Sequence, residues 1–418
     1  MEYICYNMNA YNLHIVNTKK FKTITVDICF REKINKDEIT LRNLLKEIMV
    51  NASYDYPSER ELIKATEELY DLKLLTSTYR IGNYNFLSMK IRFLNEKYTE
   101  KGMNYASIKL LLDLIFKPKL DADFEKCKNK IEKSILSLND NKVKYAISKL
   151  LESTKDMPYS YNFYGNIEDL NKITIEDIKK CYENLLTNDI IDIFVVGEVN
   201  PEEIKNIFKE NFKGKTFHKV DNKVIVKELT PRTKTNIIRE QDDINQIQLT
   251  ILCSLNSITE YERKYVSLVY SEMLGGSANS ILFDTVREKN SYAYYVNSII
   301  KPYDNNMIIY SGIHEDNEKE VIKLIKKCLK DITKGKFNDE IFQSSKNTII
   351  SSLKASLDNP IGIINNCLSN ILVSSSTIEE KIKIIEKITK EEVINFSKKI
   401  TIHTIYILEG SNEENNNQ

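Results

Sequence analysis

The most distinctive stretch of the sequence is LGGSANSILFDTVREKNSYAYYV, residues 274–296. Gly275 and Gly276 are predicted to end a helix, because a left-handed C-terminal turn costs glycine little. Arg287 is predicted in the last turn of the next helix, and Tyr294 follows seven positions later (294 − 287) at the start of a strand. On spacing alone, Arg287 would complement the helix dipole and Tyr294 would pack at the edge of the core.

Around this stretch the pattern of predicted elements occurs twice. Each half reads strand, helix, strand, helix pair, helix, strand, and Val26 and Gln248 take equivalent strand positions (248 − 26 = 222 residues apart). Six elements in register indicate a duplication. The predicted strands are 23–30, 84–94 and 190–197 in the first half, and 246–253, 307–313 and 403–410 in the second.

The duplication predicts two domains of similar size. We expect an N-terminal αβ half over 1–212, a polar and basic linker over 213–235, and a C-terminal αβ half over 236–410. Each half is long enough for one hydrophobic core. The last residues, 411–418, lack apolar side chains and are predicted to be a disordered tail.

Composition narrows the function and the compartment. Lys+Arg 60 balance Asp+Glu 60, and zero net charge argues against a nucleic-acid partner. The seven cysteines include no CxxC pair, so neither a disulfide framework nor a cysteine zinc site is expected. The N-terminus shows no signal peptide and no apolar run is long enough for a membrane span. We therefore expect a cytoplasmic protein without membrane contact.

Residues 274–294 resemble the C-terminal-half signature of the insulinase/pitrilysin family of zinc metallopeptidases, the inverzincins. Ser277, Ile281 and Ser291 depart from the family pattern, which has glycine, arginine and glycine there. A second resemblance lies in VVGEVNPEEI at 195–204, similar to the closing strand of the family's first half. The matching residues are Leu274, Gly275, Gly276, Leu282, Phe283, Val286, Arg287, Glu288, Lys289, Ala293 and Tyr294.

The resemblance implies both a fold and a role for two residues. It implies an α+β protein of two homologous αβ-roll halves, each a mostly antiparallel sheet with helices packed on one face, arranged like a clamshell. It also implies that Arg287 and Tyr294 bind the backbone of a substrate peptide by donating hydrogen bonds to its carbonyl groups. A planar, permanently charged guanidinium and a phenol on a rigid strand suit that role.

Cleavage in this family depends on an inverted zinc motif, His-x-x-Glu-His, in the first half. Aligning the flanking apolar residues puts NLLKEIMV (43–50) on that motif, so Asn43, Lys46 and Glu47 replace histidine, the general base and histidine. No histidine lies between His14 and His218, so another alignment cannot restore the site. These positions are degenerate, and we expect no bound metal, no cofactor and no catalytic residue.

His314 was the remaining candidate for a metal ligand. A second histidine or cysteine one turn away would support it, but Tyr310 and Glu318 stand at four residues on either side. We therefore expect His314 to be structural or to face solvent.

Two functions stay open on these residues. The first is a non-zinc subunit of a bacterial-type heteromeric peptidase, which holds an extended peptide for a partner with the zinc motif. The chain resembles in particular the insulinase-like proteins associated with elongation factor P modification. The second is a scaffolding subunit without peptide processing. A homodimer of the chain alone is a further open alternative, whereas an independent peptidase is disfavoured because the sequence shows no nucleophile–base constellation.

Overall fold

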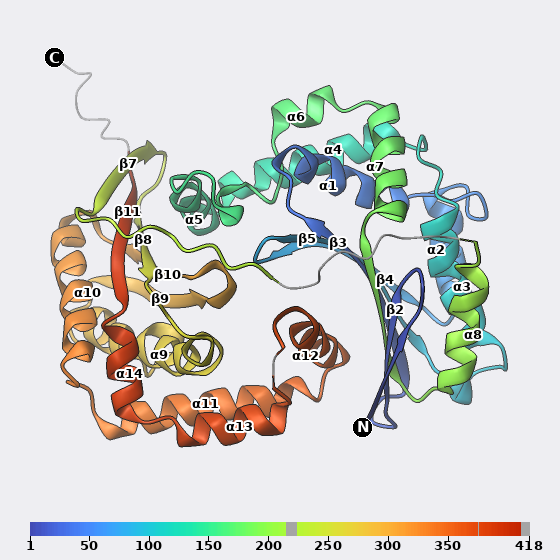
Figure 1. Cartoon of the computed structure of the whole chain (residues 1–418). Coiled ribbons are helices and arrows are strands. Elements are labelled where there is room, and N and C mark those ends of the chain that lie inside the picture. The colour runs from blue at the N-terminus through green and yellow to red at the C-terminus, as the bar shows by residue number, and fades with distance from the viewer. Residues whose placement is uncertain (215–223, 375, 411–418) are drawn as a thin grey trace, which may run out of the picture. The chain divides into compact units, whose positions relative to one another are not determined.

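The structure, a computed structural model, describes residues 1–214, 224–374 and 376–410. The chain forms two compact units (Figure 1). Unit 1 consists of Met1–Ser137, Phe163–Val224 and Ser356–Ser374. Unit 2 consists of Leu138–Asn162, Ile225–Ala355 and Ser375–Gln418.

Unit 1 contains a six-stranded sheet in the order β1-β2-β6-β3-β5-β4. All neighbouring strands are antiparallel except β2 and β6, which are parallel. The edge strands are β1 and β4. The bounds are β1 Glu2–Asn7, β2 Asn12–Asn17, β3 Thr23–Lys33, β4 Lys73–Ile81, β5 Tyr84–Leu94 and β6 Ile190–Gly197.

Unit 2 contains a five-stranded sheet in the order β7-β11-β8-β10-β9. Its only parallel pair among the described strands is β7 with β11, so it reproduces the order and directions of β2-β6-β3-β5-β4. The predicted duplication is therefore confirmed, and β1 is an addition to unit 1. The bounds are β7 Asn236–Asp242, β8 Ile247–Leu255, β9 Ala293–Lys301, β10 Asn306–Ile313 and β11 Ile400–Gly410.

Helices cover one face of each sheet (Figure 1). Apolar side chains of these helices and of the sheet form a large core in each unit. The helices of unit 1 are α1 Ile39–Met49, α2 Glu59–Glu68, α3 Met103–Phe116, α4 Phe124–Asp140 (which ends in unit 2), α6 Ile167–Lys172, α7 Ile175–Thr187 and α8 Pro201–Asn211. Those of unit 2 include α9 Ser267–Ser271, α10 Glu318–Thr333, α11 Asp339–Ser356 (whose last residue belongs to unit 1), α13 Ile378–Lys387 and α14 Lys390–Ser397. Three π-helical segments also belong to unit 2: η4 Glu262–Val266, η5 Glu272–Gly276 and η6 Phe283–Glu288.

The second face of each sheet is covered by a helix from the other half of the sequence. Helix α12 (Pro360–Val373) packs Ile364 and Leu368 against Phe86 and Phe194 of the unit 1 sheet. Helix α5 (Lys142–Glu152) packs against the unit 2 sheet. Because both faces are covered, central strands such as β6 are buried along their full length rather than alternating.

The expected αβ-roll halves are present, with two differences from the sequence prediction. The compact units exchange segments, so 1–212 and 236–410 each contribute one helix to the other half's core. The expectation of helices on one face is correct for most helices but not for α5 and α12. The predicted tail 411–418 and part of the linker, 215–223, lie outside the described residues.

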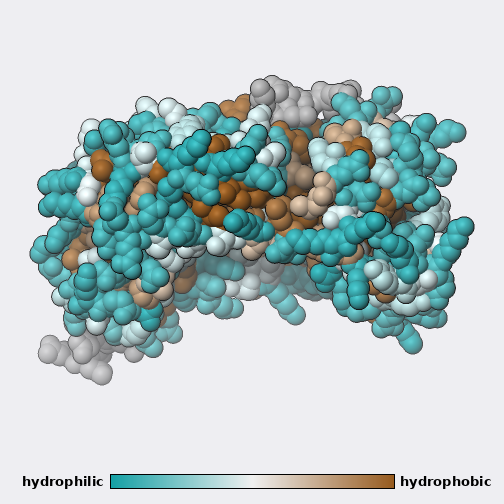
Figure 2. Space-filling model, turned by 90° about the horizontal axis from the view of Figure 1, so that it is seen from below, coloured by the Kyte–Doolittle hydropathy of each residue, from teal (hydrophilic) through white to brown (hydrophobic). Residues whose placement is uncertain are grey.

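On the face seen in Figure 2, hydrophilic residues cover most of the surface and hydrophobic residues show between them. No single helix among the described residues is long and apolar enough to cross a membrane. Helices α12 and α13 reach that length and composition only when they are taken together.

Candidate functional site

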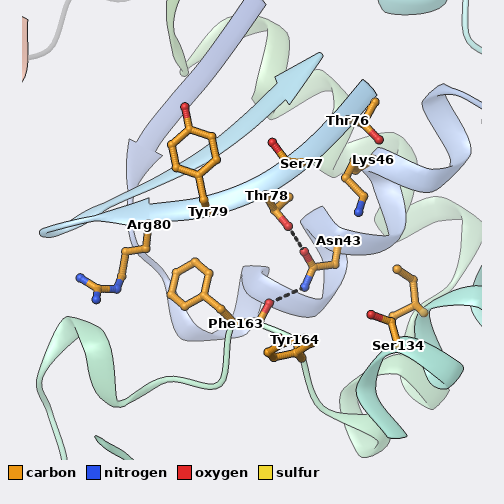
Figure 3. Close-up of a pocket in the computed structure, with 11 residues that line it drawn as sticks. Asn43, Lys46, Thr76, Ser77, Thr78, Tyr79, Arg80, Ser134, Phe163 and Tyr164 are labelled. Carbon is orange, nitrogen blue, oxygen red and sulfur yellow. Dashed lines mark hydrogen bonds between the residues drawn. The ribbon is translucent and has the colours of Figure 1, made fainter. Parts of the chain in front are cut away.

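Helix α1 carries the three degenerate zinc-motif positions. Asn43 is 5% exposed, and both ends of its amide are in use. Its Nδ2 donates to the backbone oxygen of Phe163 at 2.9 Å, and its Oδ1 accepts a hydrogen bond from Thr78 Oγ1 (Figure 3). The side chain therefore joins α1 to strand β4 and to the loop that contains Phe163.

Lys46 and Glu47 form an ion pair with each other. Their charged atoms are 3.0 Å apart, and their side chains are 16% and 24% exposed. An ammonium group can neither bind zinc nor accept a proton from water. The described residues contain no group of three or more His, Cys, Asp or Glu side chains that could hold a metal. The residues at this position therefore do not fit the zinc ion that the fold family implies.

A cavity lies over these positions. Its volume is about 490 Å³, and it lies between α1, α4, strand β4 and the loop at 163–164 (Figure 3). One wall is a run of five consecutive residues of β4, from Thr76 to Arg80. Because β4 is an edge strand, the cavity borders a row of backbone groups without a neighbouring strand.

Buried charges fix helix α1 in place. The Arg42 guanidinium, 1% exposed, bonds Asp189 through Nη1 and Nη2 at 3.2 and 2.6 Å and lies 2.7 Å from Glu32. Burial raises the pKa of Glu32 to about 8 despite the Arg42 charge. The Asp189 carboxylate raises the pKa of Arg42 further, against the effect of burial. These pairs explain α1's position without any metal.

Unit 2 carries the predicted peptide-binding pair. Arg287 is exposed on the π-helical segment η6, with its guanidinium 4.6 Å from the centre of the Phe283 ring. It makes no hydrogen bond or ion pair with any residue that the structure describes. Segments of π-helix are frequent at functional sites. Because no described residue pairs with Arg287, its five N–H donors are free to bind a ligand.

Tyr294 lies on strand β9, an edge strand, and is 54% exposed. Its hydroxyl is hydrogen-bonded to His314 Nε2 at 2.7 Å, and the ring centres are 4.8 Å apart. Nothing in the sequence alone connects these two residues, which are 20 positions apart. The antiparallel pairing of β9 with β10 brings the start of β9 beside the end of β10, and this places Tyr294 next to His314.

Gly275 has a different role from the one predicted. Its φ is −161°, so no left-handed turn ends the helix here. A side chain at this position would meet Ser298 of β9, because a Cβ would lie 2.6 Å from the Ser298 backbone nitrogen. The glycine is therefore needed for the close approach of η5 to the strand that carries Tyr294.

Residues 172–349 match the family model described as "Peptidase M16 inactive domain". A Bacillus subtilis (strain 168) protein named "Probable inactive metalloprotease YmfF" is 27% identical over 421 residues, which cover 95% of each chain. Residues 172–349 therefore match a domain of the M16 peptidases, and the chain as a whole is similar to a protein named as a probable inactive metalloprotease. The residues that replace the zinc motif on α1 are in keeping with that similarity.

Another curated relative and two solved structures are also similar to the chain. A second B. subtilis protein, "Uncharacterized zinc protease YmxG", is 23% identical and is matched over 82% of this chain and 84% of its own. The fold matches that of a conserved protein from Enterococcus faecalis V583, with a TM-score of 0.92, 24% identity and coverage of 99% and 100%. It also matches a peptidase M16 inactive domain from Pseudomonas fluorescens, with a TM-score of 0.80, 14% identity and 98% coverage of both chains.

The five predicted site residues divide between the two units. Asn43, Lys46 and Glu47 belong to unit 1, and Arg287 and Tyr294 belong to unit 2. Within unit 2, the bond from Ser291 N–H to the Arg287 oxygen ties the end of η6 to the segment that enters β9.

Proposed function

We propose that this chain is a non-catalytic subunit that binds an extended peptide and presents it to a zinc-bearing M16 partner. The observation that carries the proposal is an exposed arginine without a partner among the described residues, which lies just before an edge strand that carries an exposed tyrosine.

Arg287 suits the backbone of a peptide. The Phe283 ring, 4.6 Å from the guanidinium, supports one face and leaves the donors at the edge free. A planar fork can donate two parallel hydrogen bonds to one or two carbonyl oxygens, which a lysine ammonium cannot do with the same geometry. The neighbouring Lys289, by contrast, is paired with Asp284 at 2.6 Å.

Strand β9 supplies the backbone for such a peptide. Among the described strands it pairs only with β10. Ser271 accepts a hydrogen bond from the Ile300 N–H, and Gly275 approaches the Ser298 nitrogen. The part of the outer edge that can hydrogen-bond an added strand is therefore the beginning of β9, around Tyr294. Tyr294 is the second residue of this strand, and its exposed ring lies where an added peptide would begin. Main-chain bonds of this kind bind extended peptides with little dependence on their sequence.

A partner has to supply the cleavage. Asn43, Lys46 and Glu47 do not fit zinc, so a peptide held by this chain would be cut elsewhere. The two B. subtilis relatives illustrate a suitable pair within one organism, since one is named an inactive metalloprotease and the other a zinc protease. We propose a heterodimer with a homologue of the second kind.

The test is peptide cleavage by the chain mixed with a zinc-motif homologue from the same genome. Arg287→Ala is expected to lower kcat/KM by about 10- to 100-fold, because hydrogen bonds from a charged group contribute about 1.5–3 kcal/mol. Lys289→Ala, which removes a cation at the same helix end, is the matched control and should change kcat/KM less than about two-fold.

Tyr294→Phe keeps the ring and removes the hydroxyl, and should lower kcat/KM in the same direction. Equal activity of the wild type and of the Arg287 and Tyr294 variants would refute the proposal. A stable complex that binds no peptide would instead support the scaffolding role.

A further inference from the structure

A second group of reactive side chains lies on unit 1, away from the degenerate zinc motif. Cys5 on the edge strand β1 is directly opposite His14 on β2 in the antiparallel register. Such partners have Cβ atoms about 4.5–5.5 Å apart and point to the same face of the sheet. Asp192 of β6 and Arg31 of β3 extend the group across the sheet.

Hydrogen bonds connect His14 with Tyr3 and with Asp192, and Asp192 with Arg31. The His14 ring bonds the Tyr3 hydroxyl at 2.8 Å through Nδ1 and lies 3.4 Å from Asp192 Oδ1 through Nε2. Arg31 Nε donates to Asp192 Oδ2 at 2.8 Å. The His14 ring is 4% exposed and stacks on Phe194 with ring centres 4.9 Å apart, so its position is fixed by packing as well as by bonds.

The charges of the group favour a thiolate. Although burial alone would act the other way, the hydrogen bond with Asp192 and the neighbouring Cys5 raise the pKa of His14 to about 9. Burial would raise the pKa of Asp192, but the His14 bond and the Arg31 charge lower it to about 2. One carboxylate, Asp192, thus faces two cations, and His14, which lies directly opposite Cys5 across the strand pair, lowers the pKa of the Cys5 thiol. A thiolate at Cys5 would supply the second negative charge.

Access separates Cys5 from the other cysteines. Cys5 is exposed and Cys367 on α12 is partly exposed, while the remaining five are buried. Burial raises the pKa of Cys367 to about 11, so Cys367 is protonated at neutral pH. We propose that Cys5 is a reactive thiolate, activated by His14 and Tyr3, and a site of modification by small-molecule disulfides.

The step is a thiol–disulfide exchange. The Cys5 thiolate attacks one sulfur of the small disulfide, the S–S bond breaks, and a new bond joins Cys5 to that sulfur. The other sulfur leaves as a thiolate and takes a proton from water. No further oxidant is required, because the disulfide is the oxidising partner.

The test uses the full chain with oxidised glutathione, and with iodoacetamide for the pH profile, followed residue by residue by peptide mass spectrometry. At pH 7 Cys5 is expected to react at least about 100-fold faster than Cys367, since reactivity follows the thiolate fraction. Cys5→Ser should remove the fast reaction, and Cys367→Ser should leave it unchanged.

His14→Asn tests the activation, because an amide cannot carry the positive charge. The pH midpoint of Cys5 alkylation should rise, and the rate at pH 7 should fall about 10-fold. Tyr3→Phe alters an exposed residue and removes one donor, so it tests the same idea if the His14 variant fails to fold; a fall of about three-fold is expected. The proposal is overturned if Cys5 reacts no faster than Cys367, or if neither variant slows it.

Discussion

Replacement of Leu368 by alanine on α12 should destabilise the sheet of unit 1, although this residue comes from the last sixth of the sequence. Leu368 is 2% exposed and belongs to the cluster that contains Phe86 and Phe194. A fully buried leucine that becomes alanine loses its transfer free energy and leaves a cavity, which costs about 3–5 kcal/mol. We therefore expect the free energy of unfolding of unit 1 to fall by that amount.

Hydrogen exchange measured by mass spectrometry can locate the effect. Strands β3 and β5 belong to unit 1, and β8 and β10 belong to unit 2. A loss of about 3 kcal/mol should speed exchange in β3 and β5 by about 100-fold, because exchange from the core follows the local opening free energy. Exchange in β8 and β10 should stay within a few-fold of the wild type.

Leu150→Ala on α5 is the matched control. Leu150 is 0% exposed and belongs to the cluster with Leu252 and Tyr406 of unit 2. It should speed exchange in β8 and β10 rather than in β3 and β5, although it comes from the first half of the sequence. Faster hydrogen exchange in unit 2 for Leu368→Ala, or in unit 1 for Leu150→Ala, would show that α12 and α5 do not pack on the sheets assigned to them.

Three further outcomes are expected. Asp189→Asn should lower the free energy of unfolding by about 3–5 kcal/mol in a urea titration, because it leaves the buried Arg42 charge without its bidentate partner. Glu32, whose pKa burial raises to about 8, stabilises the fold below the ordinary carboxyl pKa and loses that contribution as the pH rises through 8. Glu32→Gln should therefore raise Tm at pH 8.5 and leave it nearly unchanged at pH 4; the reverse order would contradict the assignment. Gly275→Ala should lower Tm and weaken peptide binding, since its Cβ would lie 2.6 Å from the Ser298 nitrogen and overpacking costs about 1–3 kcal/mol; an unchanged Tm would exclude that close contact.

Elements with a strong local pattern could be predicted from the sequence. The strand predicted at 84–94 is β5, Tyr84–Leu94, and the strand predicted at 190–197 is β6, Ile190–Gly197. Strand β4 is not among the predicted strands. Its sequence, KLLTSTYRI, mixes polar and apolar residues, and as an edge strand it has no fully buried residue. Helix α12 was missed because Pro360 and Gly362 lie at its start, where Gly362 approaches the Ser356 backbone oxygen closely.

Some features of the candidate site can likewise be predicted from the sequence, and others cannot. The replacement of the zinc ligands by Asn43, Lys46 and Glu47 could be read directly from the residue types, because no fold can turn an amide and an ammonium into this metal site. The contact of Tyr294 with His314 could not, because it depends on the register between β9 and β10.

The sequence by itself determined the duplication and the loss of zinc chemistry, since both depend on residue identity and local periodicity. Only the tertiary structure decided which helix covers which sheet, and which side chains meet at Cys5, His14 and Asp192. Cys5 and Asp192 are 187 residues apart (192 − 5), and the parallel pairing of β2 with β6 brings them to one face. Strand pairing between distant segments depends on the whole sheet, because each strand satisfies its backbone hydrogen bonds only with the neighbours that the complete fold provides.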